Sequence, residues 1–266
     1  MGKIQVLIAT MHQHDCKDLI KKMNIHSDAI VINQCDTCGY DTFDSNGNQV
    51  EVYFVQDRGL SRSRNTALIK SSSEFLCIAD DDMIYSNTYV EDIIHEFDKH
   101  KDADAIVFYV KPVNGQEHNI GIKRSGRLGK LEYKEFSSVE IVVRRDKLLA
   151  SNIWFNAMFG SGGVYNCGED TMFLKDMLNK GFRIYKSSTQ IATVDMSEST
   201  WFDGYNEKYF YNKGALVAAI YPHLWPLAII VLSLKNSVKK LGGINKAKEL
   251  FLWYRAGVLD YKRRVR

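Results

Sequence analysis

Proline is scarce in this sequence, with three residues among 266, and no internal repeat or low-complexity stretch is visible. The remaining composition is ordinary, with 45% hydrophobic, 25% charged and 12% aromatic residues. These absences argue against a disordered chain and against a solenoid of repeats. A chain of this length can bury a full hydrophobic core, either as one large domain or as one domain with an appendage.

Cysteine is also infrequent, and its count of five is odd. The apolar run that ends at Ala9 is too short for a signal peptide, so we expect free thiols in a reducing cytosol and a cytoplasmic protein. Cys35 and Cys38 have the spacing of a zinc knuckle. Because no second CxxC or HxxxH pair completes four ligands, we expect no structural zinc.

The chain has no large overall excess of one charge, since its formal net charge is +3. The charged residues are, however, unevenly distributed along the sequence. Residues 235–266 contain ten Lys or Arg against Glu249 and Asp260, a balance of +8 that leaves −5 for the other 234 residues. An acidic body with a basic tail predicts that the tail meets a polyanionic surface. We expect an anionic membrane there, and no nucleic acid.

Hydrophobic periodicity predicts the elements of the main domain. Apolar, β-branched runs indicate strands over residues 4–9, 29–32, 50–55, 75–79 and 105–110. Amphipathic stretches between them indicate helices over residues 15–23, 61–70 and 87–100. After a Gly-rich, basic stretch at 113–134, interpreted as a mobile loop or short hairpin, we expect strands at 139–143 and 182–185 and a helix at 171–179. This alternation predicts an α/β fold with a mostly parallel sheet flanked by helices.

Long uncharged runs are rare, and the exception follows Gly214, where residues 215–234 contain no Asp, Glu, Lys or Arg. The length would fit a membrane span, but Pro222 and Pro226 interrupt helical hydrogen bonding. Aromatic residues and the lysines that follow favour helices lying in the interface of an anionic leaflet. The alternatives are a span or re-entrant segment, and a helix buried against the domain or a partner. We therefore predict a main domain over 1–213 and a basic, aromatic helical segment over 214–266 for membrane association.

Three adjacent carboxylates, Asp80, Asp81 and Asp82, follow directly from the apolar run that ends at Ala79. Like charges in a row repel one another, so a cation normally lies among them. A buried strand that ends in acids places them at the carboxyl edge of the sheet, where open α/β sheets bind ligands. Hard carboxylate oxygens suit Mg²⁺ or Mn²⁺ carrying a phosphorylated substrate. The alternative is a solvated acidic turn.

Two further motifs lie at predicted helix starts. The stretch from Gly59 to Asn65 combines a glycine turn, Ser61 as an N-cap candidate and the cation Arg64, a setting that suits phosphate. The alternative is an exposed cationic first turn. Glu169 and Asp170 begin a later helix, where one carboxylate would act as a general base or both would only cap the helix.

Together these motifs resemble the family 2 glycosyltransferases of the GT-A fold. An Arg-Asn pair, a hydrophobic strand leading into D-x-D acids, and Gly168-Glu169-Asp170 before a helix roughly ninety residues later occur in that order. The stretches 159–163 and 198–214 are similar to bacterial members that build surface polysaccharides. The resemblance covers about residues 3–214 and implies a GT-A, Rossmann-like catalytic domain over residues 1–213.

The resemblance also implies roles on the donor side. Asp80 would bind the ribose of a nucleotide-sugar, Asp82 would coordinate the divalent metal, and Asp81 between them would support the loop. Arg64 would help to hold the nucleotide. Thr10 stands where the family contacts the base.

The resemblance also implies roles for residues that would read the base, accept the proton or add a metal ligand, and for some of these it leaves alternatives. Either Gln34 or Asp36 would read the edge of the base. Asp170 would be the general base, with Glu169 positioning the acceptor or a loop. Asp195 stands where bacterial relatives often have a His, and would be either an additional metal ligand or a solvated turn residue.

We therefore predict an inverting glycosyltransferase dependent on Mn²⁺ or Mg²⁺, peripheral on the inner face of the cell membrane. It would move a sugar from a nucleotide-sugar, with a UDP-sugar favoured, to a hydroxyl of a saccharide acceptor, which we expect to be lipid-linked. A nucleotidyltransferase would need a glycine-rich loop after the first strand, and residues 9–15 contain no glycine. A non-catalytic, membrane-bound nucleotide-binding scaffold is the other rival, and the intact acids argue against it.

Overall fold

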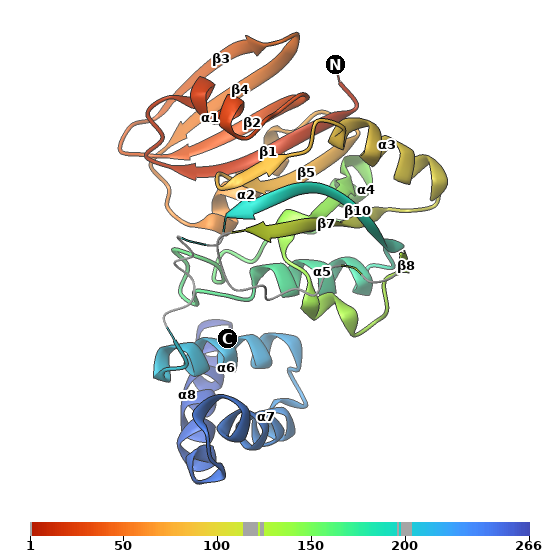
Figure 1. Ribbon diagram of the computed structural model, residues 1–266. Coiled ribbons are helices and arrows are strands. Elements are labelled where there is room, and N and C mark those ends of the chain that lie inside the picture. The colour runs from red at the N-terminus through yellow and green to blue at the C-terminus, as the bar shows by residue number, and fades with distance from the viewer. Residues whose placement is uncertain (1, 114–121, 123–124, 196, 198–203) are drawn as a thin grey trace.

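The computed structural model describes residues 2–113, 122, 125–195, 197 and 204–266. The first half alternates strands and helices, as the periodicity predicted (Figure 1). Its elements are β1 (Ile4–Met11), α1 (Cys16–Lys22), β2 (Asp28–Gln34), β3 (Gly39–Ser45), β4 (Asn48–Val55), α2 (Leu60–Lys70), β5 (Phe75–Asp80), β6 (Met83–Tyr85), α3 (Tyr89–Lys99) and β7 (Ala105–Val113). The second half contains β8 (Gly126–Arg127), the 3₁₀ turns η1 (Glu132–Glu135) and η2 (Ser138–Glu140), β9 (Ile141–Arg144), α4 (Arg145–Ala150), α5 (Glu169–Asn179) and β10 (Ile184–Asp195).

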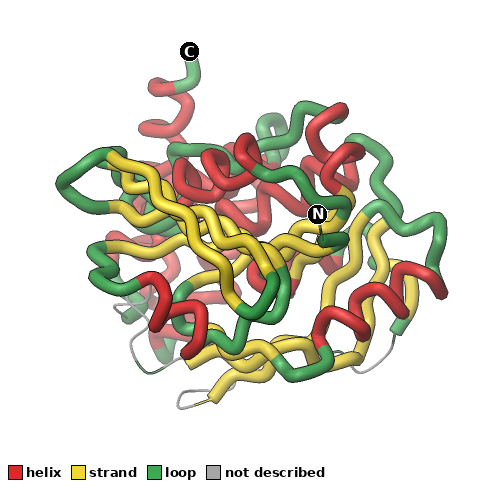
Figure 2. The backbone as a smooth tube through the Cα atoms, turned by 90° about the horizontal axis from the view of Figure 1, so that it is seen from above, coloured by secondary structure: helices red, strands yellow, loops and turns green. Residues whose placement is uncertain are grey.

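The central sheet is covered on both faces (Figure 2). In β1, Ile4, Val6 and Ile8 belong to one apolar cluster, which also contains residues of α1 and α3. Leu7 points the other way and belongs to a second cluster with residues of α2, α4 and α5. Because successive side chains of a strand face opposite sides, a strand buried on both faces must be apolar at nearly every position.

The strand order is β3-β4-β2-β1-β5-β9-β7-β10-β6, with β8 paired to β10. The pairs β1–β2, β1–β5, β2–β4 and β7–β10 are parallel, whereas the remaining pairs are antiparallel. The α/β class is confirmed, but the sheet is mixed. The predicted strand at 139–143 is the main reason, since β9 lies antiparallel between β5 and β7.

β3, which the periodicity did not predict, forms a hairpin with β4, which corresponds to the strand predicted at residues 50–55. Asn46 and Gly47 both have positive φ values, 55° and 84°, in the two-residue loop between the paired residues Ser45 and Asn48. Such Asn-Gly turns match the twist of two antiparallel strands. β3 is an edge strand with mostly exposed, polar side chains, so it lacks the apolar run that marks a buried strand.

The predicted loop or hairpin at 113–134 lies partly outside the described residues, at positions 114–121 and 123–124. Within its described part, β8 pairs antiparallel with β10, and η1 follows. The stretch 198–203, which contributed to the family resemblance, also lies outside the described residues.

The C-terminal segment is helical, as predicted, and consists of α6 (Glu207–Ile220), α7 (Trp225–Leu241), η3 (Ile244–Lys246) and α8 (Ala247–Arg264). The predicted boundary between residues 213 and 214 falls inside α6. Gly214 and Gly257 let α6 and α8 touch, because a Cβ at Gly214 would lie 2.1 Å from the carbonyl oxygen of Tyr254. In the described part of the chain, no helix is long and apolar enough to cross a membrane.

α6 also packs against the body of the protein. Leu216 belongs to one apolar cluster with Phe159 and Tyr165, which lie in the loop before α5. The Tyr165 hydroxyl donates a hydrogen bond of 2.8 Å to Asp260 of α8. Burial alone would raise the pKa of Asp260, but hydrogen bonds from Arg264 and neighbouring donors outweigh it and hold the pKa well below its usual range. The C-terminal helices are therefore anchored to the domain by both apolar and charged contacts.

Candidate active site

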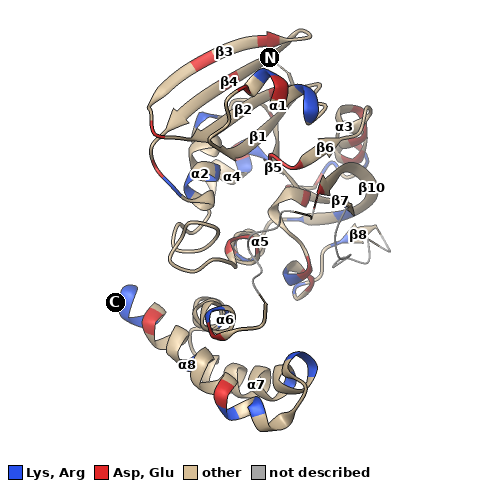
Figure 3. Ribbon diagram, turned by 60° about the vertical axis from the view of Figure 1, so that its left-hand side comes forward, with Lys and Arg blue, Asp and Glu red and all other residues tan. Residues whose placement is uncertain are grey.

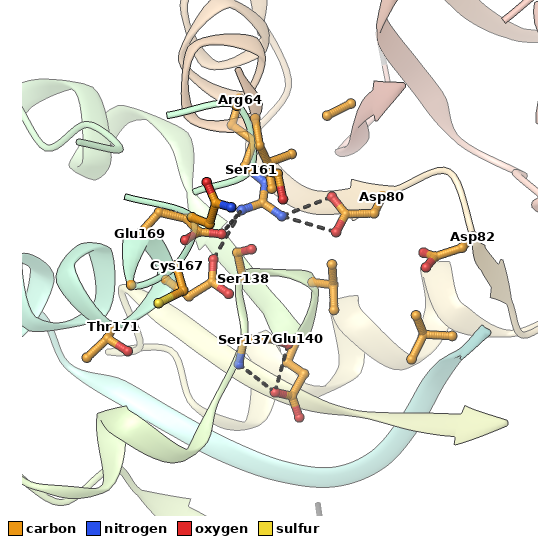
Figure 4. A pocket seen from close by; sticks show the side chains of 18 of the residues that line it. Arg64, Asp80, Asp82, Ser137, Ser138, Glu140, Ser161, Cys167, Glu169 and Thr171 are labelled. Carbon is orange, nitrogen blue, oxygen red and sulfur yellow. Dashed lines mark hydrogen bonds and ion pairs between the residues drawn. The ribbon is translucent and has the colours of Figure 1, made fainter. Parts of the chain in front are cut away.

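A cleft of about 750 Å³ opens beside the carboxyl end of β5 and the first turn of α5. It is lined by eight of the ten candidate residues, namely Thr10, Gln34, Arg64, Asp80, Asp81, Asp82, Glu169 and Asp170. The folded chain thus brings acids from two motifs, about ninety residues apart in sequence, to one cleft (Figure 4). Asp36 and Asp195 are not among the described residues that line it.

The three acids after β5 have three different environments. Asp80 accepts hydrogen bonds from Arg64 at 2.9 and 3.2 Å. Asp81 accepts a hydrogen bond of 2.5 Å from the Thr10 hydroxyl at the end of the neighbouring strand β1. Asp82 has no ion pair within the described ranges, and partial desolvation together with the charges of Asp80 and Asp81 raises the pKa of Asp82 to about 7.

Arg64 joins the two acidic groups of the cleft. Its side chain is 3% exposed, and it contacts Asp80 at 2.9 Å, Asp170 at 3.1 Å and Glu169 at 3.6 Å. The guanidinium also lies over the ring of Phe155, 5.3 Å from the centroid. Burial by itself lowers the pKa of Arg64, but the three carboxylates outweigh it and raise the pKa, so the guanidinium keeps its charge.

Arg64 lines the cleft, and its described polar contacts are with protein carboxylates, whereas the resemblance implied a contact with the nucleotide. Both of its terminal nitrogens donate to carboxylates, so the guanidinium positions these acids. The start of α2 also differs from the prediction. Its N-cap is Gly59, while Ser61 donates to the carbonyl of Phe159 and the Leu60 N–H donates to Ser161. The glycine-containing loop at 159–163 therefore occupies the helix start where phosphate was expected.

Glu169 and Asp170 form the first turn of α5, after an N-cap at Gly168 with φ of 110°. The positive φ favours glycine at this position, and a Cβ there would also lie 2.7 Å from the Leu216 side chain of α6. Glu169 is 8% exposed, and burial followed by the charge of Asp170 raises the pKa of Glu169. Asp170 is more open, with 25% of its side chain exposed. Of the pair, Asp170 is better placed to receive a proton from a ligand.

Of the two base-reading candidates, Gln34 lines the cleft and Asp36 does not. The Gln34 side-chain carbonyl accepts a hydrogen bond of 2.7 Å from the Gly59 N–H. The Asp36 side chain is 86% exposed and pairs with Arg58 at 2.6 Å. Asp36 therefore pairs with a residue that lines the cleft, Arg58, but does not line the cleft itself.

Asp195 ends β10 beside the acids, because its backbone N–H donates to the carbonyl of Asp82 at 3.1 Å. Its own carboxylate accepts from the Ser197 N–H at 2.9 Å. Among the residues that the structure describes, no three His, Cys, Asp or Glu side chains gather as a ready-made metal site.

Several lining residues were missed by sequence reasoning. Glu140 and Ser137 form a capping box around η2, and the pattern Ser-x-x-Glu at 137–140 was the available signal. Lys213 of α6 and Lys240 of α7 also line the cleft, and Lys240 lies 3.8 Å from the ring centroid of Tyr205. No local pattern could place these lysines at the cleft, since the packing of the C-terminal helices puts them there.

Part of the chain matches the model of a known protein family. Residues 40–160 match the glycosyl transferase family 2 model. The chain thus carries a family 2 segment, and the resemblance drawn from its motifs is confirmed. The matched segment contains Arg64 and the acids after β5, whereas the Glu169–Asp170 pair of the same cleft lies beyond it.

Solved structures share the fold of this chain. The crystal structure of Staphylococcus aureus TarS residues 1–349 with UDP-GlcNAc is 16% identical, covers 98% of this chain and 89% of that one, and gives a TM-score of 0.64. The complex of the same fragment with UDP gives 0.60 at 16% identity, with 98% and 91% covered. A longer TarS structure gives 0.61 at 18% identity, with 82% and 39% covered. The GT-A fold is confirmed by these likenesses. Comparison with curated proteins finds no match.

Proposed function

We propose that the protein is an inverting, divalent-metal-dependent glycosyltransferase that moves a sugar from a UDP-sugar to a hydroxyl of a saccharide acceptor. The observation that carries this proposal is the single cleft lined by both the acids after β5 and the Glu169–Asp170 pair. The family 2 match and the fold shared with proteins crystallised with UDP and UDP-GlcNAc support it.

The charge of the cleft supports a metal requirement. Asp80, Asp81, Asp82, Glu169 and Asp170 all line it, and the buried cation among them, Arg64, is already engaged by three of these acids. Directly beside these acids a diphosphate would be repelled unless a cation lay between them, and the other lining cations, which include Lys213 and Lys240, come from other elements. Mn²⁺ or Mg²⁺ held by Asp82, with Asp195 nearby, would supply the charge that offsets the leaving diphosphate.

The protein residues then have distinct parts. Asp170 removes the proton from the acceptor hydroxyl, which attacks the anomeric carbon as the bond to the diphosphate breaks. Attack from the side opposite the diphosphate inverts the anomeric centre, and no covalent enzyme intermediate is needed. Arg64 donates a hydrogen bond to Asp170 and fixes its orientation relative to Asp80. Thr10 holds Asp81, while Asp80 and Gln34 face the nucleoside.

The acceptor is proposed to be a lipid-linked saccharide used in bacterial surface polysaccharide synthesis. Lys213 and Lys240 bring positive charge to the cleft from the C-terminal helices, which suits the phosphate of a lipid carrier. Several Lys and Arg residues lie on these helices (Figure 3). We therefore place the protein on the inner, anionic face of the cell membrane.

The outer face of α7 supports this membrane contact. Exposed apolar residues recur along it at helical spacing, with exposed fractions of 63% at Leu227, 54% at Val231, 48% at Leu234 and 56% at Val238. Lys235 and Lys239 lie on the same helix. An apolar stripe bordered by lysines is the pattern of a helix that lies in an anionic interface.

The test uses the full chain, purified and treated with a chelator. Thermal unfolding is followed with UDP, with UDP-GlcNAc and with other UDP-sugars, each with and without Mn²⁺. A ligand that binds only the native state raises the midpoint, so we expect an increase that requires both nucleotide and metal. Slow release of UDP from the productive UDP-sugar should accompany it. Pyrophosphate-dependent exchange without sugar transfer would contradict the proposal, as would metal-independent binding.

A further inference from the structure

Glu140 lies beside the acids after β5 because of the sheet register. β9 runs antiparallel to β5, with Cys77 opposite Val142 and Leu76 opposite Val143. Continuing that register brings η2, the turn before β9, alongside the end of β5. Glu140 is the last residue of η2, and it lines the same cleft as Asp82 and Asp170 (Figure 4).

The carboxylate of Glu140 is only partly satisfied by the protein. Its Oε2 accepts hydrogen bonds from the Ser137 N–H at 2.8 Å and from the Ser137 hydroxyl at 3.2 Å. Its Oε1 has no hydrogen-bond partner in the part of the chain described by the structure. The adjacent Ser138 is fully buried and lines the cleft, and its hydroxyl likewise has no partner there.

A purely structural role does not account for an acid at this position. Glu140 is 4% exposed, and burial, together with the charge of Asp170 across the cleft, raises its pKa to about 7. Placing a further carboxylate in a cleft that already contains several acids costs free energy, whereas a glutamine would complete the same capping box without charge. Buried ionisable groups that face a cleft, and whose charge costs free energy there, are typical of functional sites.

We propose that Glu140 is a specificity-determining residue, whose Oε1 hydrogen-bonds a hydroxyl or amide group of the transferred sugar. This inference rests on the proposed function and names the part of the cleft that reads the sugar. Glu140 lines the same cleft as Asp82 and Asp170, and the sugar must lie in this cleft if the diphosphate is held beside Asp82 and Asp170 is the base.

The test measures affinities of UDP, UDP-glucose, UDP-galactose and their two N-acetyl forms by calorimetry with Mn²⁺ present. Wild type is compared with Glu140→Gln, Glu140→Ala and the control Glu96→Gln. Glu96 is a buried glutamate of α3, 5% exposed, and it does not line the cleft. Circular dichroism and the unfolding midpoint establish that each variant is folded. Glu140→Gln keeps the capping box if the alanine variant does not fold.

We expect UDP to bind all four proteins within about twofold. Glu140→Ala should bind the preferred UDP-sugar about tenfold or more weakly, because one hydrogen bond to the sugar is lost, and its preference between epimers should shrink. Glu140→Gln should change that preference, since an amide offers a donor where the acid offers an acceptor. Equal losses for UDP and UDP-sugars, or an unchanged order of preference, would overturn the inference while leaving the proposed function intact. If wild type bound no UDP-sugar, the proposed function and the inference would fall together.

Discussion

Arg64 donates a hydrogen bond of 3.1 Å to Asp170, although 106 residues separate the two in sequence. The other terminal nitrogen of the same guanidinium holds Asp80 at 2.9 Å. One buried cation therefore fixes the distance between an acid after β5 and the acid that begins α5. In the proposed reaction these two acids serve the donor and the acceptor, so Arg64 aligns the acids on which the two halves of the chemistry depend.

Asp170→Asn should lower turnover about a hundredfold or more and leave the affinity for UDP-sugar within a few-fold of wild type, because the variant loses the base but keeps the donor side. Sugar transfer and donor binding are measured separately with purified protein. The matched control is Asp176→Asn, which lies farther along α5 and outside the cleft. Near-normal turnover of Asp170→Asn would show that another group takes the proton.

Arg64→Met should reduce the free energy of unfolding by about 3–5 kcal/mol, since it leaves carboxylates in a buried site without their cation. Arg62→Met provides the comparison, because Arg62 pairs with Asp57 on the surface, where both side chains are more than half exposed. Loss of that exposed pair should cost about 1 kcal/mol or less. Denaturant unfolding measures both variants, and similar losses for the two would contradict the central position given to Arg64.

Glu140 should make stability depend on pH in a defined direction. Its pKa is about 7 in the folded protein and near 4.5 when unperturbed, so between these values the native state holds a proton that the unfolded state has lost. The free energy of unfolding contributed by Glu140 is thus highest below pH 4.5 and falls as the pH rises to 7. Glu140→Gln removes this dependence, so its stability relative to wild type should increase by roughly 2 kcal/mol between pH 5 and 8. Denaturant unfolding across this range checks it, and parallel curves for the two proteins would contradict it.

Replacing Leu227, Val231 and Leu234 of α7 by serine should release the protein from anionic liposomes while leaving its fold intact, because all three side chains are about half exposed or more. Ile69→Ser is the control, since Ile69 is 63% exposed but lies on α2. Sedimentation with vesicles, at low and high salt, measures the partition. Surface substitution is preferable to deleting residues 215–266, which would cut α6 and expose Phe159 and Tyr165.

Sequence reasoning recovered the elements that carry strong local patterns. The buried strands are apolar at nearly every position, and the acids at 80–82 mark the point where β5 ends. It missed β3, because an exposed edge strand has no apolar run, and it gave β9 no direction, because strand polarity is set by the neighbours. Sequence reasoning also expected Arg64 to contact phosphate, because it lies at a helix start. In the folded chain, Arg64 contacts three carboxylates.

By itself, the sequence determined which segments are buried and which residue types could carry chemistry, since both follow from composition and local spacing. Only the tertiary structure decided that Asp80 and Asp170 share one guanidinium, that Glu140 lies beside them, and that α6 and α7 bring lysines to the same cleft. These relationships depend on strand order and on helix packing at Gly214 and Gly257, which are cooperative properties of the whole core and leave no local signature.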